Sequence, residues 1–225
     1  MELRDCGVTL RDISATLRDI SVTLHPGTPE WPGDTPFDCR WSWKMSDGAS
    51  VNISAISGSP HVGTHADAPA HVKDGALCAH ELPLSAFAGP AWVIDVRHVS
   101  QTIEYSDLSL DAAASPVERV LLRTGRSIAD GQFPSEWPVL TPDCLLQLIR
   151  GGLRLVGVDC PSVDDRASQD LANHHMIFGA GAFILENLDL REVVPGRYEL
   201  IALPLKLEGL DAAPVRAALR PYPHT

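Results

Sequence analysis

The chain has 225 residues, of which 44% are hydrophobic and 21% charged, the composition of an ordinary globular protein. Its formal net charge is −11, and its basic residues form no cluster. Nucleic acids and anionic membranes bind concentrated positive charge, so neither is an expected partner. No apolar run reaches the ~20 residues that span a bilayer. The charged start, MELRDCGVTLRDIS, lacks the apolar segment of a signal peptide, so we expect a cytoplasmic protein.

The N-terminal region carries a near-repeat, TLRDISA at 9–15 followed by TLRDISV at 16–22. Two such copies are too few for a coiled coil. Apolar residues alternate from Ile20 to Leu24 as in a strand, so we interpret residues 1–15 as an extension and 16–225 as a single domain. The next segment, 25–37, holds four prolines and two glycines, and its Trp31 favours an ordered loop.

Alternating or apolar segments predict strands at 39–45, 51–57, 90–99, 117–124, 153–159, 183–190 and 198–207. The best helix is 141–152, with Thr141 as its N-cap, Pro142 in its first turn and glycines at its end. A short helix is predicted between Ala212 and Leu219. Strands outnumber helices and some connections have room for a crossover helix, so we expect an α/β fold, a mixed β-sheet core with flanking helices.

Residues 61–71, HVGTHADAPAH, place three of the nine histidines and one aspartate within eleven positions. A helical HxxxH pair would bring His61 and His65 to one metal, but Gly63 and Pro69 disfavour a helix. A fully extended chain also fails, because four residues span roughly 13 Å while ligands lie about 2 Å from a metal. We therefore expect a bent loop at a strand end, turning at Gly63 and before Pro69, that gathers four side chains.

Imidazole and carboxylate ligands together favour zinc, manganese or iron over magnesium or calcium. The alternative is a surface loop that carries histidines, but the added aspartate and third histidine favour a metal site. A further ligand set is a candidate at 173–188, where His174 or His175 precedes an apolar strand containing Glu186. A charged group in an apolar run is costly unless it is paired or metal-bound. From the residues alone, a solvent-facing Glu186 on an edge strand is an equal alternative.

The segment HVGTHADAPAH resembles the H-x-G-T/A-H-x-D-x-P-x-H signature of the metal-dependent cyclase-like hydrolases, in particular of bacterial kynurenine formamidases. The resemblance covers nearly the whole chain from about residue 18. It includes, in order, DISVTL with TPEWPGDTPF, VERVLLRTG, LVGVDCPSVD, ANHHMIFGAGAFILENL and YELIALPLKLEGLDAAPVRAALR. Thr64, the ILENL segment and residues 176–182 depart from the most frequent pattern, and these departures leave the metal site intact.

The resemblance implies metal ligands at five positions: His61, His65, Asp67, His174 and Glu186. Two zinc ions per subunit are implied, with manganese as an alternative, and both carboxylates would bridge them. The twelve-residue spacing to the glutamate selects His174 over His175 as the ligand. His71 falls on the family's catalytic acid/base, and Trp31 falls on a tryptophan that contacts substrate.

The implied reaction is hydrolysis of N-formyl-L-kynurenine to L-kynurenine and formate in tryptophan degradation, by a metal-activated hydroxide with a histidine general acid/base. The resemblance also implies a cyclase-like swivelling β/β/α fold. It further implies a homodimer or larger homo-oligomer, with the site near a subunit contact.

Some assignments remain open. Asp159 and Ser162, in VDCPSVD, either orient a ligand imidazole or stabilise a turn or helix start. Hydrolysis of isatin or another cyclic amide would use the same metal site. A non-catalytic metal-binding protein would need a closed, four-coordinate site and no His71 beside it. A serine hydrolase is unsupported, because the chain has no G-x-S-x-G elbow.

Overall fold

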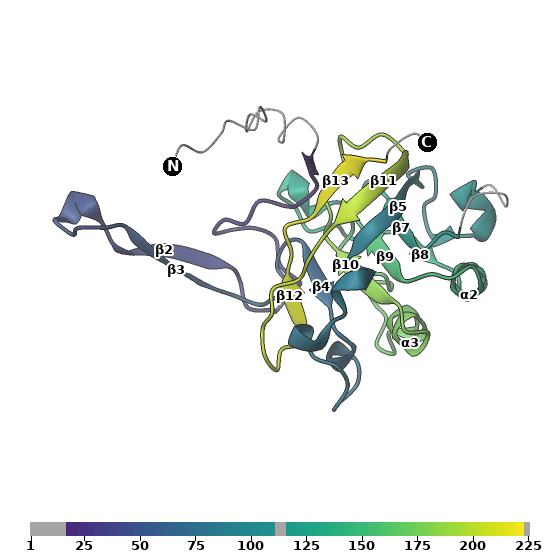
Figure 1. Cartoon of the computed structure of the whole chain (residues 1–225), viewed down its shortest axis with the longest axis horizontal. Helices are drawn as coiled ribbons and strands as arrows, with labels where there is room; N and C mark the ends of the chain where they lie inside the picture. The colour runs from purple at the N-terminus through teal and green to yellow at the C-terminus, as the bar shows by residue number, and fades with distance from the viewer. Residues whose placement is uncertain (1–16, 111–115, 223–225) are drawn as a thin grey trace, which may run out of the picture.

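The structure is a computed structural model that describes residues 17–110 and 116–222. In this part of the chain, nine strands form one sheet (Figure 1). Their spatial order is β1 (Arg18–Asp19), β13 (Ala218–Pro221), β11 (Gly196–Ile201), β5 (Ala88–Asp95), β7 (Arg119–Arg123), β9 (Leu155–Val158), β10 (Phe183–Glu186), β4 (His65–Asp67) and β12 (Ala212–Pro214). Strands β5, β7, β9 and β10 are mutually parallel, whereas the strands on either side pair antiparallel. The predicted mixed-sheet α/β fold is therefore confirmed.

The remaining elements lie around this sheet. Within the described part of the chain, strands β2 (Asp38–Trp43) and β3 (Ile53–Ser57) pair only with each other, and β6 (Thr102–Ile103) pairs with β8 (Val139–Leu140). The described α-helices are α2 (Pro142–Arg150) and α3 (Ala172–Gly179). Short 3-10 helices occur at Met45–Asp47, Pro69–His71, Ala79–Glu81, Leu84–Ala86, Tyr105–Leu108 and Ile128–Asp130. Neither described α-helix has the length and apolar character needed to cross a membrane.

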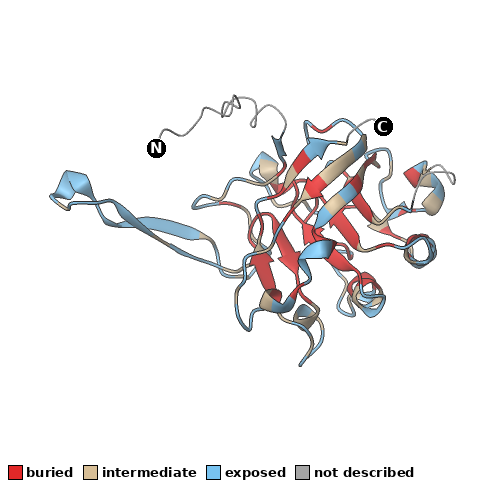
Figure 2. Cartoon of the chain, viewed as in Figure 1, coloured by how far each residue is buried: buried red, intermediate tan, exposed pale blue. Residues whose placement is uncertain are grey.

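Two apolar cores cover the two faces of the central strands. On β7, Leu121 belongs to one core, while Val120 and Leu122 belong to the other. Successive side chains of a strand point to opposite faces, so this alternation buries both sides of the sheet. The second core also contains Leu145 of α2 and Ile177 of α3. Burial on both faces explains the nearly continuous apolar runs of these strands, which Figure 2 shows as buried.

Helix α2 confirms the prediction for 141–152. The Thr141 hydroxyl accepts a hydrogen bond from the Cys144 amide at 3.2 Å, Pro142 opens the helix, and the helix ends before Gly151. The strands predicted at 90–99, 117–124, 153–159, 183–190 and 198–207 are confirmed, with the shorter bounds of β5, β7, β9, β10 and β11.

The short helix predicted between Ala212 and Leu219 is wrong. This segment forms β12, which pairs with β4, and β13, which pairs with β1 and β11. Pro214 inside a helix would remove one hydrogen bond and clash with the preceding turn, at a cost of about 3 kcal/mol. On β12, by contrast, Pro214 lies opposite His65 at the edge of the sheet, where a missing amide donor is tolerated.

The alternation from Ile20 to Leu24 overstated the first strand. Only Arg18–Asp19 form β1, and Ser21 makes an isolated bridge to Leu188. Ile20 is nevertheless fully buried. Residues 1–15, interpreted as an extension, lie outside the described residues.

The strands predicted at 39–45 and 51–57 are confirmed, but they lie outside the main sheet. They form a hairpin, β2–β3, that projects from the body of the molecule (Figure 1). Every residue of β2 is exposed.

Candidate metal centre

The histidine segment bends where its glycine and proline lie. Gly63 has φ 74°, and a Cβ at this position would lie 2.5 Å from Leu24 Cδ2, so both conformation and space require glycine. Strand β4 follows, and a 3-10 turn at Pro69–His71 bends the chain again. The predicted bends are confirmed, although the stretch between them is a short buried strand and not a loop.

Strand register places three acidic or imidazole side chains on one face of the sheet. Glu186 of β10 lies directly opposite His65 of β4, and Ile184 lies opposite Asp67. Directly opposed residues of an antiparallel pair share a face, so His65, Asp67 and Glu186 point the same way. Ile184 packs in the core that contains α3. The same face therefore receives His174, which α3 carries.

These side chains converge around the Asp67 carboxylate. Its Oδ1 lies 3.1 Å from His61 Nδ1 and 3.2 Å from His65 Nε2, whereas its Oδ2 lies 3.4 Å from His174 Nε2. Glu186 is shared in the same manner, with Oε2 3.5 Å from His65 Nε2 and Oε1 3.5 Å from His174 Nε2. Two adjacent ligand groups result, and Asp67 belongs to both.

The burial of this cluster fits a bound cation. Asp67 is 0% exposed, and neither of its oxygens has a hydrogen-bond partner among the described residues. The Nε2 atom of His174 is also buried without a partner. An unpaired buried carboxylate costs several kcal/mol, and a metal ion would supply the missing interaction. The donor set of imidazole nitrogens and carboxylate oxygens suits zinc, manganese or iron.

The second nitrogen of each imidazole is already engaged. His65 Nδ1 lies 2.9 Å from the Gly63 carbonyl, His174 Nδ1 lies 2.7 Å from Asp164 Oδ2, and His61 Nε2 lies 3.0 Å from Asp211 Oδ2. These oxygens only accept, so those nitrogens donate their protons. Each neutral ring therefore presents its lone pair towards Asp67, as metal-binding histidines do.

Asp164 and Asp211 are functional candidates that the sequence analysis missed. Asp164 is the last residue of the VDCPSVD segment, in which Asp159 and Ser162 were the predicted candidates for either an orienting or a turn role. Asp159 instead accepts hydrogen bonds from the Thr124 and Gly125 amides, which is the turn role left open above. Ser162 lines the cavity described below, and its hydroxyl accepts a hydrogen bond from the Asp164 amide at 3.1 Å. No sequence signal links Asp211 to His61, 150 positions away.

Charge and burial together determine the pKa values of the rings. Burial lowers the pKa of His65, but the Asp67 and Glu186 carboxylates outweigh it and raise the value to about 10. Against the same effect of burial, the Asp211 and Asp67 carboxylates raise the pKa of His61 to about 9. Burial likewise lowers the pKa of His174, but Asp164, Asp67 and Glu186 together raise it to about 10. Without metal the rings are therefore protonated at neutral pH, and a metal must displace these protons.

A cavity of about 310 Å³ opens beside the cluster. Its lining includes His61, His65, His174 and Glu186, together with His71, which is 30% exposed in its side chain. The His71 ring lies 4.4 Å from that of His61 and 5.6 Å from that of His174, centroid to centroid. The volume falls at the lower end of small-molecule sites.

Trp31 lines the same cavity and is 38% exposed. It makes edge contacts with Phe133 at 5.5 Å and with Trp137 at 6.0 Å. The proline-rich loop around Trp31 is thereby held as part of the cavity wall. All of the sequence-predicted site residues thus lie at the cluster or its cavity, whereas His175 is exposed on α3 and outside the ligand groups.

Comparison with known proteins identifies the family. Residues 18–165 match the family described as "Putative cyclase", which is more than half of the chain. The chain belongs to this family. It is 44% identical over 205 residues to a kynurenine formamidase of Salinibacter ruber, covering 89% of this chain and 95% of that protein.

Two solved structures share the fold. A predicted metal-dependent hydrolase from Bacillus stearothermophilus has a TM-score of 0.75 at 30% identity, over 90% of this chain and 97% of that one. Isatin hydrolase A from Labrenzia aggregata has a TM-score of 0.77 at 26% identity, over 93% of this chain and 95% of that one.

Zinc binding to the metal-free protein is expected to release protons at pH 7, because its three ring pKa values lie at about 9 and 10. Apparent zinc affinity should therefore increase as pH rises from ~6 to ~9. Calorimetric titration in two buffers of different ionisation enthalpy should report about three protons released, one from each ring. His174→Gln should lower this number by about one. Release close to zero would contradict the prediction.

Proposed function

We propose that this chain hydrolyses N-formyl-L-kynurenine to L-kynurenine and formate. The observation that carries the proposal is the pair of ligand groups sharing Asp67, with His71 beside them at the cavity. The proposed metal ligands are His61, His65, Asp67, His174 and Glu186, and the proposed metals are two zinc ions, with manganese as the alternative. The 44% identity of this chain to an enzyme named kynurenine formamidase supports the choice of substrate.

Metal ions held by these residues would supply Lewis acidity, which polarises an amide carbonyl and acidifies water. His71 is the proposed acid/base. Its Nδ1 lies 3.2 Å from Asp211 Oδ2, so Nε2 carries the lone pair. That nitrogen accepts a proton as water oxygen bonds to the formyl carbon. It then returns the proton to the aniline nitrogen as the C–N bond breaks, which yields formate and the free amine.

The cavity wall supports an aromatic substrate. Trp31 offers a partly exposed indole that is held in T-shaped contacts with Phe133 and Trp137. Stacking of the substrate's aryl ring on it would contribute about 0.5–1.5 kcal/mol beyond burial. An aryl formamide and isatin both have an aromatic ring that could stack on Trp31. Because the chain is similar to isatin hydrolase A, isatin is the second candidate substrate.

Asp34 favours N-formyl-L-kynurenine over isatin. It lines the cavity, and its amide donates to the Trp31 carbonyl at 2.9 Å, which holds acid and indole on one turn. Among the described cavity-lining residues, it is the one charged group outside the proposed ligands and His71. N-formyl-L-kynurenine carries an α-ammonium group that a carboxylate attracts, and isatin carries none.

The purified protein should convert N-formyl-L-kynurenine, followed by the absorbance of kynurenine. Activity should be lost on chelation and return with zinc. His71→Ala should lower kcat at least about 100-fold, because the proton acceptor is gone. His98→Ala is the matched control, since this exposed histidine lies outside the cavity and should leave kcat unchanged. Zinc-loaded protein that leaves N-formyl-L-kynurenine intact and hydrolyses isatin would replace the proposed substrate.

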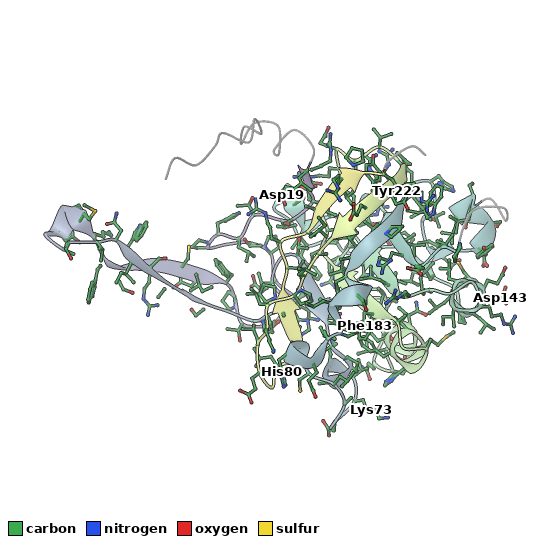
Figure 3. The ribbon with its side chains drawn as sticks, in the orientation of Figure 1. Asp19, Lys73, His80, Asp143, Phe183 and Tyr222 are labelled. Atoms are coloured by element: carbon green, nitrogen blue, oxygen red, sulfur yellow. The ribbon has the colours of Figure 1, made fainter. Side chains whose placement is uncertain are left out.

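Asp34→Asn should raise KM for N-formyl-L-kynurenine about tenfold, equivalent to ~1.4 kcal/mol. The KM for formanilide, which has no ammonium group, should change little. Asp143→Asn removes a carboxylate from helix α2, at the right-hand edge of the molecule in Figure 3, and serves as the charge-matched control. Equal KM changes for both substrates would show that Asp34 does not bind the ammonium group.

We also propose that the chain forms a homodimer or larger homo-oligomer through the β2–β3 hairpin. The hairpin is exposed along its length (Figure 2), and side chains stand out from both of its sides (Figure 3). Its large apolar side chains are between 42% and 73% exposed: Trp41, Trp43, Met45, Val51, Ile53 and Ile56. An isolated hairpin is marginally stable in water, and exposed apolar patches mark interaction surfaces. A second copy of the chain is the proposed partner, as the family resemblance implies.

Light scattering after size-exclusion chromatography should report a dimer or larger species for the wild-type protein. Replacing Trp41 and Trp43 together by Ser should shift the protein towards monomer, because both indoles leave the proposed interface. Leu84→Ser, at a 58% exposed leucine outside the hairpin, is the matched control and should leave the mass unchanged. A monomeric wild-type protein at micromolar concentration would contradict the proposal.

A further inference from the structure

Asp211 is held against the histidine segment by its backbone. Its carbonyl accepts a hydrogen bond from the Ala68 amide at 2.8 Å, and the next residue, Ala212, lies opposite Asp67 in the β12–β4 pair. The sheet register therefore fixes residue 211 beside the turn that leads to His71. Asp211 is not among the five proposed ligands of the metal pair.

One oxygen of Asp211 contacts two imidazoles. Oδ2 lies 3.0 Å from His61 Nε2 and 3.2 Å from His71 Nδ1. An ionised carboxylate accepts and cannot donate, so both nitrogens donate to it. The lone pairs then fall on the opposite nitrogens, His61 Nδ1 and His71 Nε2. His61 Nδ1 is the atom that faces Asp67 Oδ1, at 3.1 Å.

We propose that Asp211 is a positioning residue that sets the tautomers of both rings at once. It directs the lone pair of His61 towards the metal and keeps His71 Nε2 free to accept the proton of the reaction. The inference rests on the proposed function for the step that His71 performs. Asp164 provides the internal contrast, because its carboxylate contacts His174 and does not contact His71.

A double-mutant cycle tests the link between Asp211 and His71. Asp211→Asn should lower kcat about 10–100-fold in zinc-saturated protein, with KM changed less than about twofold. In the His71→Ala background the same substitution should lower kcat less than about threefold further, because the part of its effect that acts through His71 is already lost and only the part that acts through His61 remains. Asp164→Asn is the matched control: its loss of kcat and that of His71→Ala should multiply in the double variant. Full multiplication of the Asp211→Asn loss with His71→Ala would overturn the proposal.

Metal content separates the positioning role from a ligand role. The atoms of His61, His71 and Asp211 lie within 4.8 Å of one another, close enough to hold a cation themselves. If His71 is not a ligand, as proposed, elemental analysis of His71→Ala should find as much zinc as in the wild-type protein. Loss of one equivalent would make His71 a ligand and overturn the proposal.

Nitrogen NMR of the zinc-loaded protein tests the tautomer without any substrate. His71 should carry its proton on Nδ1 in the wild-type protein and become a mixture of tautomers in Asp211→Asn. A proton on Nε2 in the wild-type protein, or an unchanged His71 spectrum in the variant, would overturn the proposal. This measurement needs no turnover. If the protein is inactive towards N-formyl-L-kynurenine, the proposed substrate is wrong, but the NMR result still tests the positioning role of Asp211.

Discussion

The buried carboxylate of Asp67 is the constraint on which the rest of the site depends. It lies on β4, between β10 and β12, and is fully buried, and no residue in 17–110 or 116–222 gives either oxygen a hydrogen-bond partner. A bare carboxylate in that position would strongly destabilise the fold, so compensating groups must surround it. Three imidazoles meet this requirement: His61 and His65 of the same segment lie beside Oδ1 of Asp67, and His174 of α3 lies beside its Oδ2.

Asp164 shows how closely the fold and the site are connected. Its carboxylate accepts hydrogen bonds from the Asn173 and His174 amides at the start of α3, and it also holds His174 Nδ1. Helix α3 has no side-chain cap at Leu171, which adopts a left-handed conformation that is unfavourable for leucine. Asp164 therefore offsets the cost of the helix start while it orients the ring. Its carbonyl accepts from Trp137 Nε1 at 2.8 Å, which connects the same residue to the aromatic wall.

Local sequence was sufficient to predict the structure where the residues that determine it are neighbours in the chain. The bends of 61–71 follow from Gly63 and Pro69, and the start of α2 follows from Thr141 and Pro142. Sequence was insufficient where the determining partner is distant. Two amides in the first turn of α3 donate to the Asp164 carboxylate, which lies nine and ten positions upstream of them, and no capping rule anticipates this. The segment at 212–221 forms two strands because it pairs with β1 and β4, whose residues lie far earlier in the chain. Asp211 reaches the site only through that pairing.

Charge balance accounts for the number of acids around the cluster. Four carboxylates lie at or beside the rings, those of Asp67, Glu186, Asp164 and Asp211, and they carry four negative charges. Two divalent cations, as proposed, would match them while the imidazoles stay neutral. Without metal, the raised pKa values of His61, His65 and His174 let three protons replace most of that positive charge. The same buried cluster is therefore compatible with folding before metal is bound, and metal capture becomes an exchange of cations in a site whose negative charge is already in place.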